Sequence, residues 1–187
     1  MPVRPARLPR PGDRLFRAHR RLIGRPEDFA YQEHIERVTY GQVRADVSAA
    51  VVHLRETGSH GIFTIGFCFG GKLSFLSATF GLDLAGVIGL HAGLGPRNDV
   101  PPPVDHASDF RSPVLGLFGG ADPSIPPEAI ADFDRALSAA GVEHRFVSFP
   151  GAPHSFFDRK FSEFVEQNAA AWRDVLAFVG SQERVAA

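Results

Sequence analysis

The chain has 187 residues, of which 44% are hydrophobic, and its aromatic residues are 17 Phe, two Tyr and one Trp. This length and composition suit one domain with a single sizeable core and exclude a disordered or fibrous protein. The net charge is −1, and a single Cys excludes an internal disulfide framework and a zinc site built from cysteines.

The first predicted element is a basic segment. Residues 1–26 contain eight Arg and five Pro but only one acidic residue, Asp13, so the remaining chain has 12 basic and 20 acidic residues, a net charge of −8. We expect a poorly ordered basic arm here, followed by one domain over residues 27–187. The alternatives are a transit peptide, a nucleic-acid-binding arm and the altered start of a longer domain. The absence of Ser and of interleaved aromatic residues argues against the first two, so no nucleic-acid partner is expected.

Helices and strands alternate along the rest of the chain, because apolar residues at helical spacing are separated by short, fully apolar runs. In chain order we predict a helix at 42–57, a strand at 61–66, a helix at 70–80, a strand at 85–90, a loop at 93–112, a strand at 114–118, a helix at 126–140, a strand at 145–149 and a helix at 162–179. This alternation predicts an α/β fold with three layers, in which helices cover both faces of a mostly parallel sheet.

No apolar stretch approaches the length that is needed to cross a bilayer, and no apolar segment of the signal-peptide kind follows the start. We therefore expect a cytoplasmic protein with no membrane partner.

The only cysteine, Cys68, lies within GFCFGG at 66–71, between the predicted strand 61–66 and the helix 70–80. Glycines on both sides permit a tight strand-to-helix turn, the pattern of a nucleophile elbow with sulfur in place of oxygen. At the N-terminal end of a helix, the helix dipole and free amides favour a thiolate. The sequence thus predicts a nucleophilic cysteine; the alternative is an inert buried thiol.

Two further residues follow predicted strands and complete a set for acyl transfer. Asp122 follows the strand at 114–118, and His154 follows the strand at 145–149. Parallel strands direct such turns to one sheet edge, where Cys68, Asp122 and His154 would serve as nucleophile, orienting acid and base. Taken singly, Asp122 could be an ordinary turn residue and His154 a loop histidine. The backbone amide of Phe69 would be an oxyanion donor.

Two other residues near these turns have more general interpretations. The string GFCFGGKL at 66–73 matches part of a phosphate-binding loop, but Leu73 stands where a Ser or Thr must bind magnesium. We therefore expect Lys72 to be a surface residue of the helix rather than a nucleotide ligand. His91 ends the strand at 85–90 and is a candidate to line a pocket.

The chain resembles the dienelactone hydrolase family of α/β-hydrolases over about residues 27–180. The resemblance rests on GFCFGG at 66–71, FGGAD at 118–122 and FPGAPHSF at 149–156, with the helix ADVSAAV at 45–51 also similar. It implies that Cys68 attacks a carboxylic ester, typically an enol-lactone, to form a thioester that His154 and water then hydrolyse. It also implies Asp122 as the orienting acid, and neither a metal nor a cofactor.

The resemblance further suggests residues that hold a substrate carboxylate. Family members use arginines for this, and Arg159, shortly after the histidine, is a candidate, although its spacing from His154 is one residue longer than in the family pattern. Arg17, whose surroundings are less similar to the family, is a weaker candidate for a second arginine of this kind.

The chain departs from the family before the elbow. Only about 60 residues precede the cysteine strand, and none forms a convincing buried strand, so the expected fold is N-terminally incomplete. The family's acidic residue near the cysteine and its second oxyanion donor would be missing with these strands. The cysteine strand would then have an unpaired edge, which favours self-association. The alternative function is a catalytically incompetent homologue that binds small acids or associates with itself.

Overall fold

A computed structural model describes residues 31–158 and 160–186, so the predicted arm at 1–26 lies outside the described residues. The elements are α2 (Tyr31–Ile35), α3 (Tyr40–Glu56), β1 (Phe63–Phe67), α4 (Phe69–Ser77), β2 (Gly86–Leu90), the 3-10 helix η1 (Pro103–Asp109), β3 (Val114–Gly119), α5 (Pro127–Ala139), β4 (His144–Phe149) and α6 (Val165–Ala186). They confirm the predicted alternation of strands and helices.

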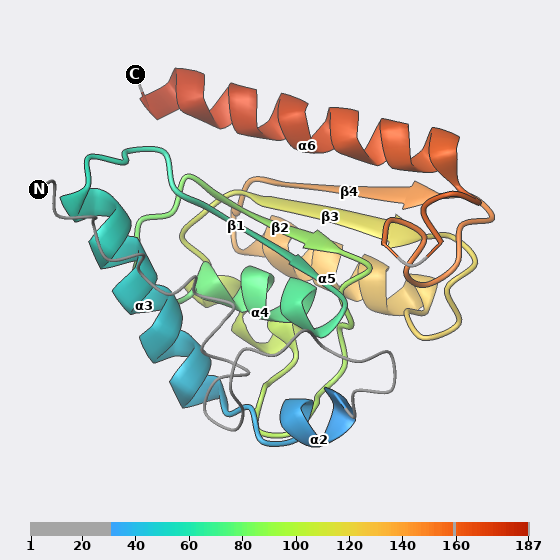
Figure 1. Cartoon of the computed structure of the whole chain (residues 1–187), viewed down its shortest axis with the longest axis horizontal. Helices are drawn as coiled ribbons and strands as arrows, with labels where there is room; N and C mark the ends of the chain where they lie inside the picture. Colours follow the sequence, from blue (N-terminus) through green and yellow to red (C-terminus); the bar gives the residue numbers. More distant parts are fainter. Residues whose placement is uncertain (1–30, 159, 187) are drawn as a thin grey trace, which may run out of the picture.

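The described strands form one parallel sheet in the order β1-β2-β3-β4. Because every strand runs the same way, the segments that follow the strands all begin at one edge of the sheet (Figure 1). The predicted sheet is therefore confirmed. Its carboxyl edge is where the sequence predicted Cys68, Asp122 and His154.

Helices cover the sheet on two sides, as the three-layer prediction requires (Figure 1). On one face Ile88 and Leu115 pack in a cluster with Val175 of α6. On the other face the alternate residues Val87 and Val114 belong to a cluster that includes side chains of α4 and α5. Strands β2 and β3 are buried along their whole length because both of their faces are covered.

The sequence explains where the helices α3 and η1 begin. Helix α3 begins after Thr39, whose side chain accepts a hydrogen bond from the Gln42 backbone N–H, while the Gln42 side-chain oxygen accepts one from the Thr39 backbone N–H. The predicted loop at 93–112 is wrong in part, because it contains η1. Pro103 begins this short helix, where the missing N–H of proline costs no hydrogen bond.

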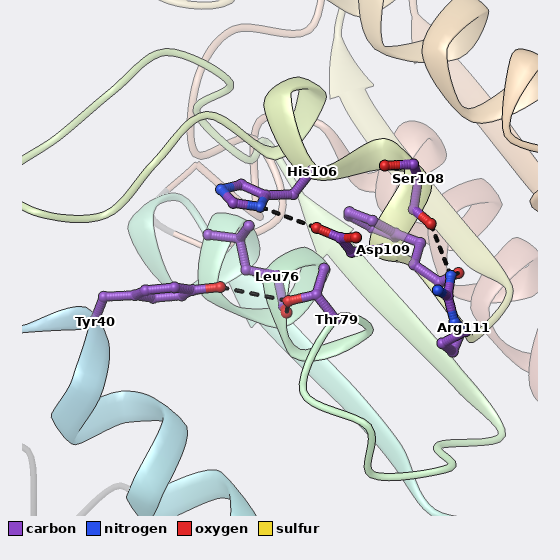
Figure 2. A network of polar contacts seen from close by, with 8 residues as sticks. Tyr40, Leu76, Thr79, His106, Ser108, Asp109 and Arg111 are labelled. Atoms are coloured by element: carbon purple, nitrogen blue, oxygen red, sulfur yellow. Dashed lines mark hydrogen bonds and ion pairs between the residues drawn. The ribbon is translucent and has the colours of Figure 1, made fainter.

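The segment that follows η1 is fixed to the end of α4. Arg111 donates its backbone N–H to the Ala78 carbonyl at 3.0 Å and its guanidinium to the Ser108 carbonyl at 2.8 Å. On the other side of α4, the Tyr40 hydroxyl lies 3.4 Å from the Thr79 hydroxyl, as Figure 2 shows. These contacts join the start of α3 and the segment after η1 to the C-terminal end of α4.

Strand β1 is an edge strand of the described sheet. Residues 31–62 form α2 and α3 and contribute no strand, so among the described residues nothing pairs with the outer edge of β1. Ile65 and Phe67 on this strand are 46% and 39% exposed. A groove of about 430 Å³ runs beside the strand between α3 and α4. The unpaired edge predicted from the sequence is thus present in the described part of the chain.

Candidate active site

Cys68 stands in a sharp strand-to-helix turn. It follows the last residue of β1, precedes the first residue of α4, and has the backbone angles φ 52° and ψ −118°. Positive φ is unfavourable for a residue with a side chain, so the neighbouring structure must hold it. The Cys68 N–H donates to the Leu90 carbonyl at 3.0 Å, which ties the turn to β2. The predicted elbow geometry is therefore confirmed.

Residue 66, just before the elbow, must be glycine because the backbone of α4 approaches it closely. A Cβ on Gly66 would lie 2.0 Å from the carbonyl oxygen of Gly70, far inside van der Waals contact. The first turn of α4 can therefore fold back against β1 only if residue 66 has no side chain. This contact leaves the Cys68 side chain half-buried at the start of the helix.

Asp122 and His154 form a close pair at the same edge of the sheet. Their side chains follow β3 and β4, and Asp122 Oδ2 lies 2.6 Å from His154 Nδ1. The Asp122 side chain is fully covered, whereas that of His154 is one-third exposed. A carboxylate on Nδ1 selects the tautomer with the proton on that nitrogen, which leaves Nε2 as the basic atom. The sequence-predicted pairing of these two residues is thus confirmed.

Ser124 completes the hydrogen bonding of the carboxylate. Its backbone N–H and hydroxyl both donate to Asp122 Oδ1, at 2.9 and 2.6 Å. Burial alone would raise the pKa of Asp122, but the hydrogen bonds from Ser124 and His154 outweigh it and lower the pKa below its ordinary value. Ser124 is not among the residues predicted from the sequence; its position two residues after an Asp, in an Asp-Pro-Ser turn, was the available signal.

The loops that carry the pair are joined by their backbones. Gly120 N–H donates to the Phe149 carbonyl at 2.8 Å, and Ala121 N–H donates to the Ala152 carbonyl at 2.9 Å. A Cβ on Gly119 would lie 2.5 Å from the Ala152 carbonyl oxygen, so this close approach also needs glycine. The glycines of the FGGAD motif therefore let the histidine loop lie directly on the aspartate loop.

His91 follows β2 and lies between the two halves of the site. It is fully buried, and the centroid of its ring is 4.9 Å from that of His154. Burial, and then the neighbouring His154, lower the pKa of His91 from 6.5 to about 4, although the Asp158 and Asp122 carboxylates oppose this shift. Its predicted position at a strand end is confirmed, but the sequence did not indicate its contact with His154.

The prediction that Lys72 is a surface residue is wrong. Lys72 is 2% exposed, and its ammonium group donates to the Gly95 carbonyl. Burial, followed by the Arg97 guanidinium, lowers the pKa of Lys72 from 10.5 to about 8, with Cys68 opposing. The error arose because the loop after β2 folds over the first turn of α4, a contact between distant segments.

Other predicted roles remain predictions. None of the described residues forms a hydrogen bond with the Cys68 thiol, so its contact with His154 is an expectation from the order of the strands. Phe69 is the first residue of α4, and its backbone N–H has no acceptor among the residues that the structure describes. Arg17 and Arg159 lie outside the described residues.

Neither a metal cluster nor a membrane-spanning helix occurs in the described part of the chain. No group of three or more His, Cys, Asp or Glu side chains within residues 31–158 and 160–186 is arranged to hold a metal ion. In the same ranges, no helix combines the length and the apolar character that a bilayer crossing requires.

Comparison with known proteins identifies relatives that are similar to this chain over much of its length. The chain is 34% identical over 143 residues to a Salmonella typhimurium protein, and 38% identical over 134 residues to one from Methylorubrum extorquens; both carry the name of a carboxymethylenebutenolidase. These matches cover 71% and 66% of this chain but 53% and 45% of the relatives, so the chain spans about half the length of the curated relatives it matches.

A solved structure shows the same fold. A crystal structure from Klebsiella pneumoniae, described as that of a dienelactone hydrolase, superposes with a TM-score of 0.74 at 29% identity and covers 80% of this chain and 65% of that one. The model of the dienelactone hydrolase family matches residues 20–182. On this match, with the elbow and the Asp–His pair in the family's order, the chain belongs to the dienelactone hydrolase family.

Proposed function

We propose that this chain is a carboxylic ester hydrolase that opens enol-lactones or related esters through Cys68, His154 and Asp122. The single observation that carries the proposal is the 2.6 Å bond between Asp122 and His154 at the same sheet edge as the cysteine elbow. The names of the relatives supply the substrate class.

The acylation step begins at sulfur. His154 Nε2 takes the proton of the Cys68 thiol, and the sulfur adds to the ester carbonyl. The negative charge that develops on the carbonyl oxygen is met by the N–H of Phe69 at the helix N-terminus. The tetrahedral species then expels the alkoxide or enolate, which takes the proton from His154, and a thioester remains. In a lactone the leaving oxygen stays attached to the acyl group.

The second step returns the enzyme to its starting state. His154 accepts a proton from water, the hydroxide adds to the thioester carbonyl, and the carbon–sulfur bond breaks. The thiolate recovers the proton from His154, and the carboxylic acid is released. Asp122 stays ionised throughout and keeps Nδ1 protonated, so that the same nitrogen of His154 serves in both steps. Arg159 would hold a carboxylate of the substrate.

The test combines turnover with labelling. Wild-type protein should hydrolyse a dienelactone or an aryl acetate, and one equivalent of iodoacetamide should alkylate it and abolish turnover. Cys68→Ala should lose at least about 10³ in kcat with its unfolding midpoint nearly unchanged. Retained turnover in this variant would remove Cys68 from the mechanism.

A second candidate function follows from the open β1 edge. The exposed Ile65 and Phe67, together with the groove beside them, favour a self-associating homologue without catalysis. This candidate predicts no ester turnover, a thiol of ordinary reactivity, and a sedimentation coefficient that rises with protein concentration.

A further inference from the structure

His91 shows two unusual features outside the three proposed catalytic residues. It has a positive φ of 39°, although it is not glycine, and its backbone N–H donates to the Leu117 carbonyl at 2.7 Å. Its side chain is fully buried, yet neither ring nitrogen has a hydrogen-bond partner among the described residues. Backbone strain and unpaired buried polar atoms both lower stability, and both occur preferentially at functional positions.

The His91 ring packs against His154, the proposed base. The rings of His91 and His154 meet edge to face, with centroids 4.9 Å apart and planes at 67°. The ring centroids of Phe67 and Phe156 lie 6.0 and 6.3 Å from that of His91. The nearest carboxylate, Asp158, lies 3.9 Å from Nε2, which is beyond hydrogen-bond distance. His154 is therefore the proposed catalytic residue whose ring packs against that of His91.

We propose that His91 is a positioning residue for His154, whose neutral ring fixes the base and stabilises, through its dipole, the positive charge that His154 acquires during catalysis. This inference rests on the proposed function, because it assigns to His154 the role of base. Apolar packing alone would need only a ring of this size at this position. An imidazole with unpaired nitrogens adds a dipole that can face the developing charge.

The charge state of His91 supports this role. The groups that face it are His154, Asp122 and Asp158, and together with burial they leave its pKa at about 4. His91 is therefore uncharged at neutral pH, when His154 takes and returns its proton. A second positive charge beside His154 would oppose that step.

The experiment compares three variants for kcat, KM and unfolding midpoint on an aryl acetate at pH 7.5. His91→Phe keeps an aromatic ring but removes the dipole and the unpaired nitrogens. We expect an unfolding midpoint equal to or above that of wild type, kcat lower by about tenfold, and KM within twofold. His91→Gln restores an uncharged dipole and should have a kcat between those of wild type and His91→Phe. The matched control is His144→Phe at the opposite end of β4, which should leave kcat unchanged.

The outcomes separate this inference from the proposed function. Full activity of His91→Phe, or a kcat of His91→Gln at or below that of His91→Phe, would overturn the positioning role. Absence of ester turnover in wild type would instead overturn the proposed function. In that case the rate of Cys68 alkylation by iodoacetamide still tests His91. It should fall in His91→Phe, and an unchanged rate would contradict the inference.

Discussion

On the β3–β4 side of the site, Asp122 is buried and accepts hydrogen bonds from both His154 and Ser124, and the two loops are joined by backbone bonds. On the β1 side, Cys68 occupies a strained elbow, and its strand has an unpaired edge within the described residues. The first side is formed by neighbouring segments between residues 114 and 154 that satisfy each other's polar groups. The second depends on a sheet edge that has no neighbouring strand among residues 31–158 and 160–186. Within the described residues, the Asp122–His154 pair therefore forms without a strand beside the outer edge of β1.

The largest expected effect tests the Asp122–His154 pair on the β3–β4 side of the site. Asp122→Asn keeps the shape of the carboxylate but can donate a hydrogen bond to His154 Nδ1, which favours the wrong tautomer. We expect kcat to fall by about 10³–10⁴ with KM little changed. Steady-state kinetics measure this, and His154 should retain its position in a crystal structure of the variant. A loss below about tenfold would show that the pair does not govern turnover.

The next effect tests the elbow on the β1 side. Gly66→Ala would place a Cβ 2.0 Å from the Gly70 carbonyl oxygen. We expect the free energy of unfolding in urea to fall by about 3 kcal/mol or more. The matched control is Gly70→Ala, because a Cβ there meets nothing within 4 Å.

This control lies within α4 and should be neutral or stabilising by up to about 1 kcal/mol. Equal stability of the two alanine variants would show that the elbow does not need glycine at residue 66.

A third prediction concerns pH and the buried histidine between the two sides. His91 has a pKa of about 4 in the folded protein against 6.5 in the unfolded chain. Between these values the unfolded chain binds a proton that the folded protein does not, so stability falls as the pH is lowered from 6.5 to 4. The expected loss is on the order of 3 kcal/mol.

Urea unfolding at pH 7, 5.5 and 4.5 measures this loss, and His91→Phe should have a flatter dependence. Below about pH 4 a further loss is expected from Asp122, whose lowered pKa makes the folded state the weaker proton binder. An identical pH dependence in wild type and His91→Phe would contradict the assignment.

The smallest expected effect tests the open edge itself. Ile65→Lys places a charge on β1 at a side chain that is 46% exposed, so its unfolding free energy should change by no more than about 0.5 kcal/mol. If copies of the chain associate through this edge, the variant should sediment as a smaller species than wild type at the same concentration. Val52→Lys, on the exposed face of α3, is the control. Loss of association in both variants, or in neither, would place the contact elsewhere.

The local sequence predicted the four strands, the elbow and the Asp122–His154 pair. These depend on short-range signals: apolar runs of strand length, glycines where backbones must approach closely, and polar residues just after strands. Because consecutive strands of this fold are adjacent and parallel, residues at strand ends come together without further information. The position of Cys68 at the helix N-terminus follows from the same local pattern.

The tertiary structure alone decided how the space around these residues is filled. Lys72 is buried because the loop after β2 covers it, and His91 meets His154 because the loops after β2 and β4 converge. Ser124 joins Asp122 through the exact path of one turn. Burial and side-chain contact between segments that are distant in the chain depend on the packing of the whole molecule, which no short stretch of sequence encodes.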